Sequence, residues 1–342
     1  MIAAHQWKRK REMGVELEHI DIGDLRGIAL ANDALRVVVI PEIGGKIISL
    51  MSRRTGREWL WTNPHLPLRR PPLDASNFGQ FDCGGWDEIF PTVNSCRLPN
   101  TAWGDRMLTD HGELWYRPWQ TLATEVAPCE IASLELAVCD PALPFHFART
   151  LTLAAGSGPL IVNYELLNRS NRLLPYFWAA HPLLAIYPGD VICLPIDTPI
   201  SSTHSIGLDL DTDSTPFAWP RMRLRSGKTI DFSRVPERTV GIAAKLFAEH
   251  VSTGCVEVRD ETRRESIRIS FDPTSIPHVG LWLNYGGWSG TAATSYFNAG
   301  IEPTTSVCDA LSIAVRDEKA KQLELGERHF WQITVKCADD LK

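Results

Sequence analysis

Short apolar runs, rich in β-branched residues and ended by glycine or proline, recur along this chain and constrain its fold most. Residues 34–40 form one such run, which stops at Pro41, and Gly44 and Gly45 then allow a tight turn before residues 46–51 resume. Further runs of this kind are residues 146–153, 160–167, 176–180, 191–194, 254–259, 266–271, 280–284 and 330–335. Such runs are typical of strands. They predict an all-β protein, an antiparallel sandwich or barrel.

The remaining segments give one helix candidate and two long loops. Residues 243–250 are the helix candidate. Residues 62–85, rich in Pro and Arg, and residues 196–229, rich in Ser, Thr, Asp and Pro, are predicted to be loops. Loops this long inside a compact domain are usually functional or mobile. No shift in composition marks a boundary, so residues 1–342 are expected to form a single domain.

The composition argues against several kinds of partner. Hydrophobic residues make up 44% of the chain and charged residues 22%, and the formal net charge is −6. An acidic chain of this kind is not expected to bind nucleic acid or an anionic membrane. No apolar run approaches the roughly 20 residues of a membrane helix, and the N-terminus lacks the apolar segment of a secretory signal. We therefore expect a cytoplasmic protein.

The cysteines and tryptophans add two constraints. The eight cysteines include no C-x-x-C pair, so we expect free thiols rather than a zinc or redox site. The chain has 12 Trp residues, as many as Phe and twice as many as Tyr. A flat aromatic face suits both a large β core and the apolar face of a pyranose ring. Most of these rings must lie in the core, and a few are expected to line a site.

His181 is the first candidate for chemistry. It follows the apolar run 176–180 and precedes Pro182. Because proline cannot donate a hydrogen bond to a sheet, His181 is expected at a strand end or edge, where a cleft can open. A histidine there can give a proton to a ligand. The alternative is a partly buried structural histidine.

Glu302 is the second candidate. It follows the apolar stretch 297–301 and precedes Pro303. A carboxylate in such a strand is costly to bury unless it is paired or used. Burial is expected to raise its pKa, which would make it a better base near neutral pH. The alternative is an exposed carboxylate at a strand end.

Two further segments carry polar residues beside glycine. His111 and Glu113 flank Gly112, and in an extended segment they would share one face. Gly112 would let a ligand or a backbone segment approach closely. Trp86 and Asp87 follow two glycines and precede a second acid, Glu88. Carboxylates accept hydrogen bonds from sugar hydroxyls, and an indole can cover the ring, so this segment is a candidate sugar-recognition loop. A structural histidine and a turn with solvated acids are the alternatives.

Together, residues 110–115, 180–182 and 300–303 resemble the aldose 1-epimerase (galactose mutarotase-like) family in their residue types and their order. The resemblance covers about residues 25–337. It implies a large antiparallel β-sandwich that binds a small-molecule carbohydrate and needs no metal or organic cofactor. Its H-G-x-x-W stretch corresponds to residues 111–115.

The resemblance also implies roles for individual residues. Glu302 would act as the catalytic base and His181 as the catalytic acid, on opposite sides of a sugar ring and separated by a gap that admits it. His111 would bind the sugar, and Trp86 or Trp282 would lie on the wall of the site.

Two departures from the family pattern leave the substrate open. The Asn-Arg pair expected before the first histidine is absent, and Asp87 lies in roughly that region. The acid expected between the second histidine and the glutamate has no counterpart, and Lys245 is the nearest polar candidate. The alternatives are a non-catalytic carbohydrate-binding or regulatory protein and a sugar-phosphate epimerase that uses the arginines at 53–54 or 69–70. A lyase is a third. The oligomeric state stays open, a homodimer included.

Overall fold

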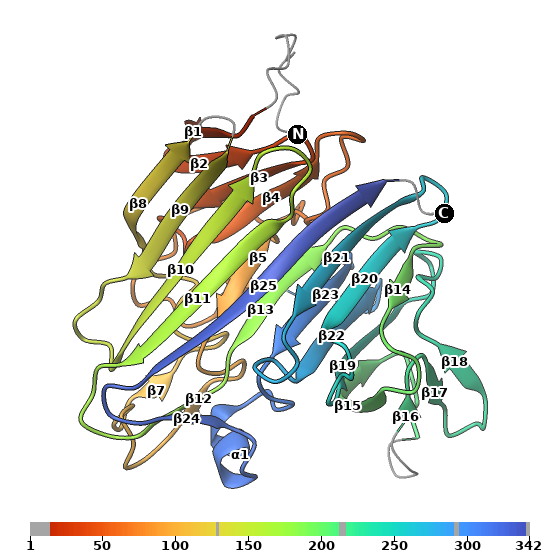
Figure 1. Cartoon of the computed structure of the whole chain (residues 1–342). Coiled ribbons are helices and arrows are strands. Elements are labelled where there is room, and N and C mark those ends of the chain that lie inside the picture. Colours follow the sequence, from red (N-terminus) through yellow and green to blue (C-terminus); the bar gives the residue numbers. More distant parts are fainter. Residues whose placement is uncertain (1–13, 128–129, 212–216, 291–293, 340–342) are drawn as a thin grey trace.

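The computed structural model describes residues 14–127, 130–211, 217–290 and 294–339. Two large sheets lie one against the other (Figure 1), with 13 strands in the larger and eight in the smaller. All neighbouring strands of the described residues pair antiparallel, as the Gly- and Pro-punctuated runs predict. None of the described helices is long and apolar enough to cross a membrane.

The larger sheet contains, in spatial order, β1 (Glu16–Ile22), β2 (Leu25–Ala31), β3 (Leu35–Ile40), β4 (Lys46–Ser52), β5 (Trp86–Ile89), β13 (Ala179–Leu184), β23 (Phe297–Thr304), β22 (His278–Tyr285), β19 (Ile242–Ala248), β15 (Pro199–Ile206), β16 (Phe217–Ala218), β17 (Arg221–Arg223) and β18 (Thr229–Asp231). The smaller sheet contains β14 (Val191–Cys193), β20 (Cys255–Asp260), β21 (Glu265–Phe271), β25 (Arg328–Asp339), β11 (Leu160–Asn168), β10 (Phe145–Ala154), β9 (Ile131–Val138) and β8 (Gln120–Ala127). The short elements are the pairs β12 (Leu174–Tyr176) with β24 (Lys321–Leu323) and β6 (Cys96–Arg97) with β7 (Met107–Leu108), the 3₁₀ turn η1 (Phe78–Gln80) and the helix α1 (Leu311–Arg316).

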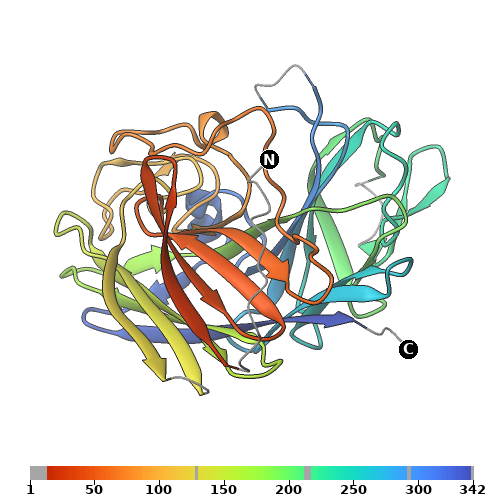
Figure 2. The same ribbon diagram turned by 90° about the horizontal axis from the view of Figure 1, so that it is seen from above.

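The core lies between the two sheets. Trp86 of β5 and Ile301 of β23 belong to the same buried apolar cluster as Phe147 of β10 and Val162 of β11. Successive side chains of a strand point to opposite faces. The neighbours of Trp86 and Ile301 in their strands therefore point to the outer face of the larger sheet, away from the smaller one. Figure 2 shows the orange loops that follow β4 on that outer side.

Two elements differ from the sequence-based predictions. Residues 243–250 were predicted to be helical, but most of them belong to strand β19, which pairs with β15 and β22. Ala and Leu are compatible with either structure, and pairing on both sides decides the outcome. Residues 196–229 were predicted to be a loop, but they contain β15, β16 and β17. Their polar side chains are compatible with strands near the edge of an antiparallel sheet, because one face of such a sheet can be exposed to water.

The other long segment, residues 62–85, has the loop structure that its Pro and Arg content predicts. Its only regular element is η1. The one described α-helix, α1, was not predicted, since only Leu311 and Ala314 of it are buried and the apolar signal is correspondingly short.

Candidate functional site

The candidate site lies on the outer face of the larger sheet, where five neighbouring strands contribute side chains. His181 of β13 is opposite Asp87 of β5 in the register, and Glu302 of β23 is opposite Gly280 of β22. Lys245 of β19 is opposite Trp282 of β22. Directly opposed residues share a face, and β22 carries residues 280 and 282 on the same face. The order of strands thus gathers residues that are far apart in sequence.

His181 and Glu302 are in direct contact. The imidazole Nδ1 lies 3.0 Å from Oε1 of Glu302, and both side chains are buried. Lys245 donates a short hydrogen bond to the other carboxylate oxygen, Oε2. The prediction that a gap of a sugar ring's width separates His181 from Glu302 is therefore wrong. The reason is topological: β13 and β23 are neighbours in the sheet, so the two side chains stand side by side rather than facing one another across a cleft.

The contacts of Glu302 also reverse the expected change in its pKa. Burial favours the neutral acid and would raise the pKa, but the charges of Lys245 and His181, with hydrogen bonds from both, lower it well below its usual range. Glu302 is therefore an ionised carboxylate at every pH near neutrality. Both of its oxygens already accept a hydrogen bond from a described residue.

Two glycines give the Glu302 carboxylate its space. A Cβ atom on Gly280 would lie 2.7 Å from Oε2, and one on Gly300 would lie 2.8 Å from Oε1. A real Cβ atom essentially never comes this close to a non-bonded atom. Glycine in a strand weakens it and often marks a close approach. Here the Glu302 carboxylate approaches both strands closely, with Oε2 over Gly280 and Oε1 over Gly300.

His111 reaches the same place from a loop. Its ring centroid lies 5.5 Å from that of His181, and the two rings meet edge to face. Nδ1 of His111 lies 2.9 Å from Oδ1 of Asp110, which leaves Nε2 for a ligand. The pKa of Asp110 is lowered, because burial, which would raise it, is outweighed by hydrogen bonds and by the charge of His111.

The segment around His111 is a turn, not the extended strand that would put His111 and Glu113 on one face. His111 itself has φ 59° and Gly112 has φ 80°. A Cβ atom on Gly112 would lie 2.1 Å from the carbonyl oxygen of Phe90, so this glycine accommodates a backbone segment. Glu113 turns away from His111 and accepts hydrogen bonds from Thr109 and Tyr116.

The alternation of β5 separates the residues that were expected to form one sugar-recognition loop. Trp86 is fully buried between the sheets, so its ring offers no face to a ligand in this structure. Glu88 points the same way and binds Arg149 and Tyr164 of the smaller sheet. Only Asp87 points to the outer face. The adjacent acids therefore do not act as a pair.

Asp87 forms a buried ion pair with Lys46. The ammonium group donates a short bond to Oδ2 and a bond of 2.8 Å to the carbonyl oxygen of Gly84. Burial would lower the pKa of Lys46, but the charge of Asp87 and its hydrogen bond, together with the nearby Cys83 and Asp82, outweigh burial and raise it. Oδ1 of Asp87 is buried and has no hydrogen-bond partner among the described residues. It is therefore an acceptor that a ligand hydroxyl could use.

Phe78 is the aromatic residue of the site that sequence reasoning missed. Its ring stacks on His111 at a centroid distance of 4.0 Å and meets His181 edge to face at 6.0 Å. The backbone N–H of Phe78 also binds Asp110, so one carboxylate holds both rings of this stack. Phe78 lies in a long irregular loop, and nothing in the local sequence pattern marks it. Trp282, the other predicted wall residue, is half-buried and lies opposite Gly300 in the register.

The described residues offer few candidates for binding a metal ion or a phosphate group. Among the described residues, no group of three or more His, Cys, Asp or Glu is placed to hold a metal ion. Arg53 and Arg70, two of the arginines considered for a phosphate, pair with Glu16 and Glu42. The cations that the structure does place at the site are lysines, Lys46 and Lys245.

Solved structures of low sequence identity share this architecture. A match to a suspected aldose 1-epimerase from Klebsiella pneumoniae covers 95% of this chain and 83% of that one, with a TM-score of 0.71 and 15% identity. A galactose mutarotase-like protein from Clostridium acetobutylicum matches over 96% of this chain and 99% of its own, with a TM-score of 0.63 and 15% identity. A galactose mutarotase-like protein from Lactobacillus casei matches over 91% of this chain and 100% of its own, with a TM-score of 0.59 and 14% identity.

These likenesses show that the chain has the galactose mutarotase-like fold, a large antiparallel β-sandwich, as its motifs lead one to expect. At such identities they establish the fold alone. Residues 23–102 also match the model of a domain family of unknown function, DUF5107. Among curated proteins no match was found.

Proposed function

We propose that this protein is an aldose 1-epimerase, which interconverts the α and β anomers of a free sugar by opening its ring. The observation that carries the proposal is the contact of His181 with Glu302, beside His111, on one face of the sheet. Histidine and carboxylate are the side chains most often used to move protons in catalysis. The shared fold of suspected aldose 1-epimerases supports the same conclusion.

Ring opening removes a proton from the anomeric hydroxyl and adds one to the ring oxygen. Both oxygens are bonded to the same carbon, so two groups in contact can serve them, and no gap of a ring's width is needed. Glu302 would take the proton from the hydroxyl, and Nε2 of His181 would donate one to the ring oxygen. Rotation about the C1–C2 bond and reversal of the two transfers give the other anomer. Each group is expected to contribute roughly 10²–10⁴-fold.

The other residues of the site would bind the sugar. Nε2 of His111 and Oδ1 of Asp87 can bond to hydroxyl groups, and Phe78 and Trp282 offer apolar ring surface. Lys245 would hold the Glu302 carboxylate in place. It also limits the strength of the base, because a carboxylate with a lowered pKa accepts a proton less readily.

The test is NMR exchange spectroscopy across free aldoses, uronates and sugar phosphates, followed by variants on the best substrate. Glu302→Gln keeps the shape but loses the basic carboxylate, so exchange should fall by roughly 10²-fold or more while affinity is retained. His181→Asn should behave in the same way. His111→Asn should mainly weaken binding. Full exchange in Glu302→Gln would disprove the role of this carboxylate.

A non-catalytic carbohydrate-binding protein is the second candidate, and one observation favours it. Both oxygens of Glu302 already hold hydrogen bonds, and Phe78 packs against both histidines. A site whose carboxylate and histidines already have partners within the protein can bind a sugar without removing a proton from it. Saturable binding of a free sugar, with anomer exchange no faster than in buffer, would establish this function in place of the first.

A further inference from the structure

A cavity lies beside Ala185, which follows β13, and Phe297, which begins β23. Its volume is about 200 Å³, and its lining includes Trp61, Tyr187, Tyr296 and Arg238. Pockets for drug-sized ligands measure about 300–1,000 Å³. This one therefore suits a ligand no larger than a single sugar ring.

Aromatic rings form much of the cavity wall. The centroids of Trp61 and Tyr296 lie 5.0 Å apart, and Tyr296 also stacks on His65. Tyr187, from the segment after β13, is 40% exposed although it lines the cavity. Flat aromatic faces pack well against the C–H face of a pyranose.

Arg238 adds a positive charge to this aromatic wall. Its guanidinium carbon lies 4.5 Å from the centroid of the Phe297 ring, which also lines the cavity. No carboxylate of the described residues pairs with this guanidinium. Arginine stacked on an aromatic ring keeps its planar donors free, and they match the two oxygens of a carboxylate.

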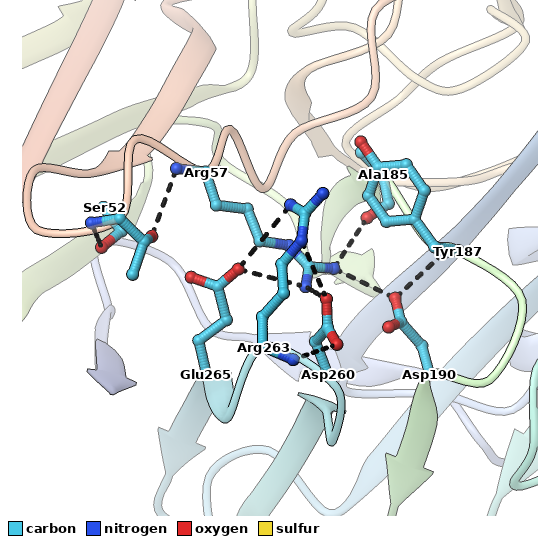
Figure 3. Close-up of polar contacts among 9 residues, drawn as sticks. Ser52, Arg57, Ala185, Tyr187, Asp190, Asp260, Arg263 and Glu265 are labelled. Carbon is cyan, nitrogen blue, oxygen red and sulfur yellow. Dashed lines mark hydrogen bonds and ion pairs between the residues drawn. The ribbon is translucent and has the colours of Figure 1, made fainter. Parts of the chain in front are cut away.

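The part of the wall formed by Ala185 and Tyr187 is held by a buried ionic network (Figure 3). Arg57 lies between Asp190, at 3.0 Å, and Asp260, at 2.9 Å, and also donates to the carbonyl oxygen of Ala185 at 3.4 Å. Asp190 accepts the backbone N–H of Tyr187 at 2.9 Å. These bonds fix the segment that carries Ala185 and Tyr187. Because this wall is formed before any ligand arrives, binding would cost little ordering.

The cavity is separate from the site around Glu302. Phe297 and Glu302 are five residues apart on β23, a span of about 17 Å at the usual rise of a strand. A single sugar cannot touch both.

We propose that this cavity is a second binding site, for a monosaccharide that carries a carboxylate, such as a uronate. The aromatic wall takes the ring, and Arg238 takes the carboxylate. The proposal does not depend on the activity proposed above.

Isothermal titration calorimetry with methyl β-glucuronide tests it, because this glycoside cannot open its ring and gives no signal from anomer exchange. We expect binding to the wild type, at least tenfold weaker binding to Arg238→Ala, and partial recovery in Arg238→Lys. Methyl β-glucoside, the neutral control, should bind at least tenfold more weakly than the glucuronide. Arg238→Ala, at an exposed position, should leave anomer exchange unchanged.

Other outcomes would overturn the proposal. The wild type could bind no glucuronide, it could bind the neutral glucoside as tightly as the glucuronide, or Arg238→Ala could bind the glucuronide as tightly as the wild type does. Tighter binding of glucose 6-phosphate than of the glucuronide would replace the carboxylate with a phosphate. Loss of binding in Glu302→Gln would place the ligand at the other site. If the wild type catalysed no anomer exchange on any sugar tested, that would count against the proposed activity and leave the proposal for this cavity unaffected.

Discussion

At the scale of single residues, Lys245 determines what Glu302 can do. The sequence identifies Glu302 through its neighbours Gly300 and Pro303, and burial alone predicts a raised pKa. The opposite result comes from a lysine 57 positions earlier in the chain, whose ammonium group binds Oε2. Strand order brings the two together, and no local pattern in the sequence contains that information.

Removing this lysine charge should move the pKa of Glu302 back up toward its usual range. In the wild type the pKa of Glu302 is lowered, so Glu302 stays ionised as the pH falls and does not limit activity near neutrality. In Lys245→Met the carboxylate keeps its burial but loses one positive charge. An opposite charge typically lowers a carboxylate pKa by 1–3 units. The acid limb of the pH profile of exchange should therefore move upward by about 1–3 pH units.

The matched control for this prediction is Lys245→Arg, which keeps the positive charge and should keep the acid limb in place. The measurement is the rate of anomer exchange from about pH 3 to pH 8, on the substrate that the wild type prefers. An acid limb that does not move in Lys245→Met would show that Glu302 is not the group whose ionisation controls the reaction.

At the scale of elements, alternation along the strands decides which predictions hold. The strand pattern was read correctly for β3, β10, β11 and β21, because β-branched and alternating apolar residues reflect burial of one or both faces. The face to which each side chain points depends on which sheet covers the strand. Trp86 was therefore expected in the site but lies in the core, and Asp87, one residue later, lies on the outer face.

The strand glycines beside Glu302 give a prediction at this scale. The added methyl group of Gly280→Ala would lie 2.7 Å from Oε2 of Glu302, and the flexible end of that side chain would move aside. The fold should survive, but a displacement of about 1 Å can cost on the order of 10²-fold in rate. Exchange kinetics and a thermal melt together check this. Gly300→Ala should act in the same way on Oε1.

Gly158→Ala is the control for the glycine variants. The nearest atom to its added Cβ would lie 3.5 Å away, and this residue is remote from Glu302 in the fold. It should change neither the rate nor the melting temperature appreciably. Unchanged exchange in both Gly280→Ala and Gly300→Ala would show that the exact position of the carboxylate does not matter, against the proposed mechanism.

At the scale of the whole molecule, a buried ion pair joins the two sheets behind the site. Glu88 of β5 accepts hydrogen bonds from Arg149 at 2.7 Å, Tyr164 at 2.9 Å and Trp178 at 2.8 Å. Burial raises the pKa of Glu88 to about 7, although these three partners oppose the shift. The sequence showed only an acid next to another acid. Two of its partners, Arg149 and Tyr164, come from strands of the opposite sheet, and pattern analysis cannot pair residues across two sheets.

The cost of losing Arg149 should therefore depend on pH. In Arg149→Met an ionised Glu88 would be buried without its counter-charge, which typically costs about 3–5 kcal/mol of the free energy of unfolding. A neutral Glu88 avoids that cost. Since the folded pKa is already about 7 with Arg149 present, and losing the cation raises it further, Glu88 takes up a proton in the folded variant as the pH falls. The folded state then binds more protons than the unfolded state, so stability rises as the pH falls.

Urea denaturation at pH 8.5 and pH 5.5 checks this dependence. The loss of stability in Arg149→Met, relative to the wild type at the same pH, should be largest at pH 8.5 and clearly smaller at pH 5.5. Arg328→Met removes a cation from an exposed pair with Glu165 and should cost no more than about 1 kcal/mol at either pH. An equal loss in Arg149→Met at both pH values would mean that Glu88 does not take up a proton. The stabilising element would then be the packing of the Arg149 side chain between the sheets, not its charge.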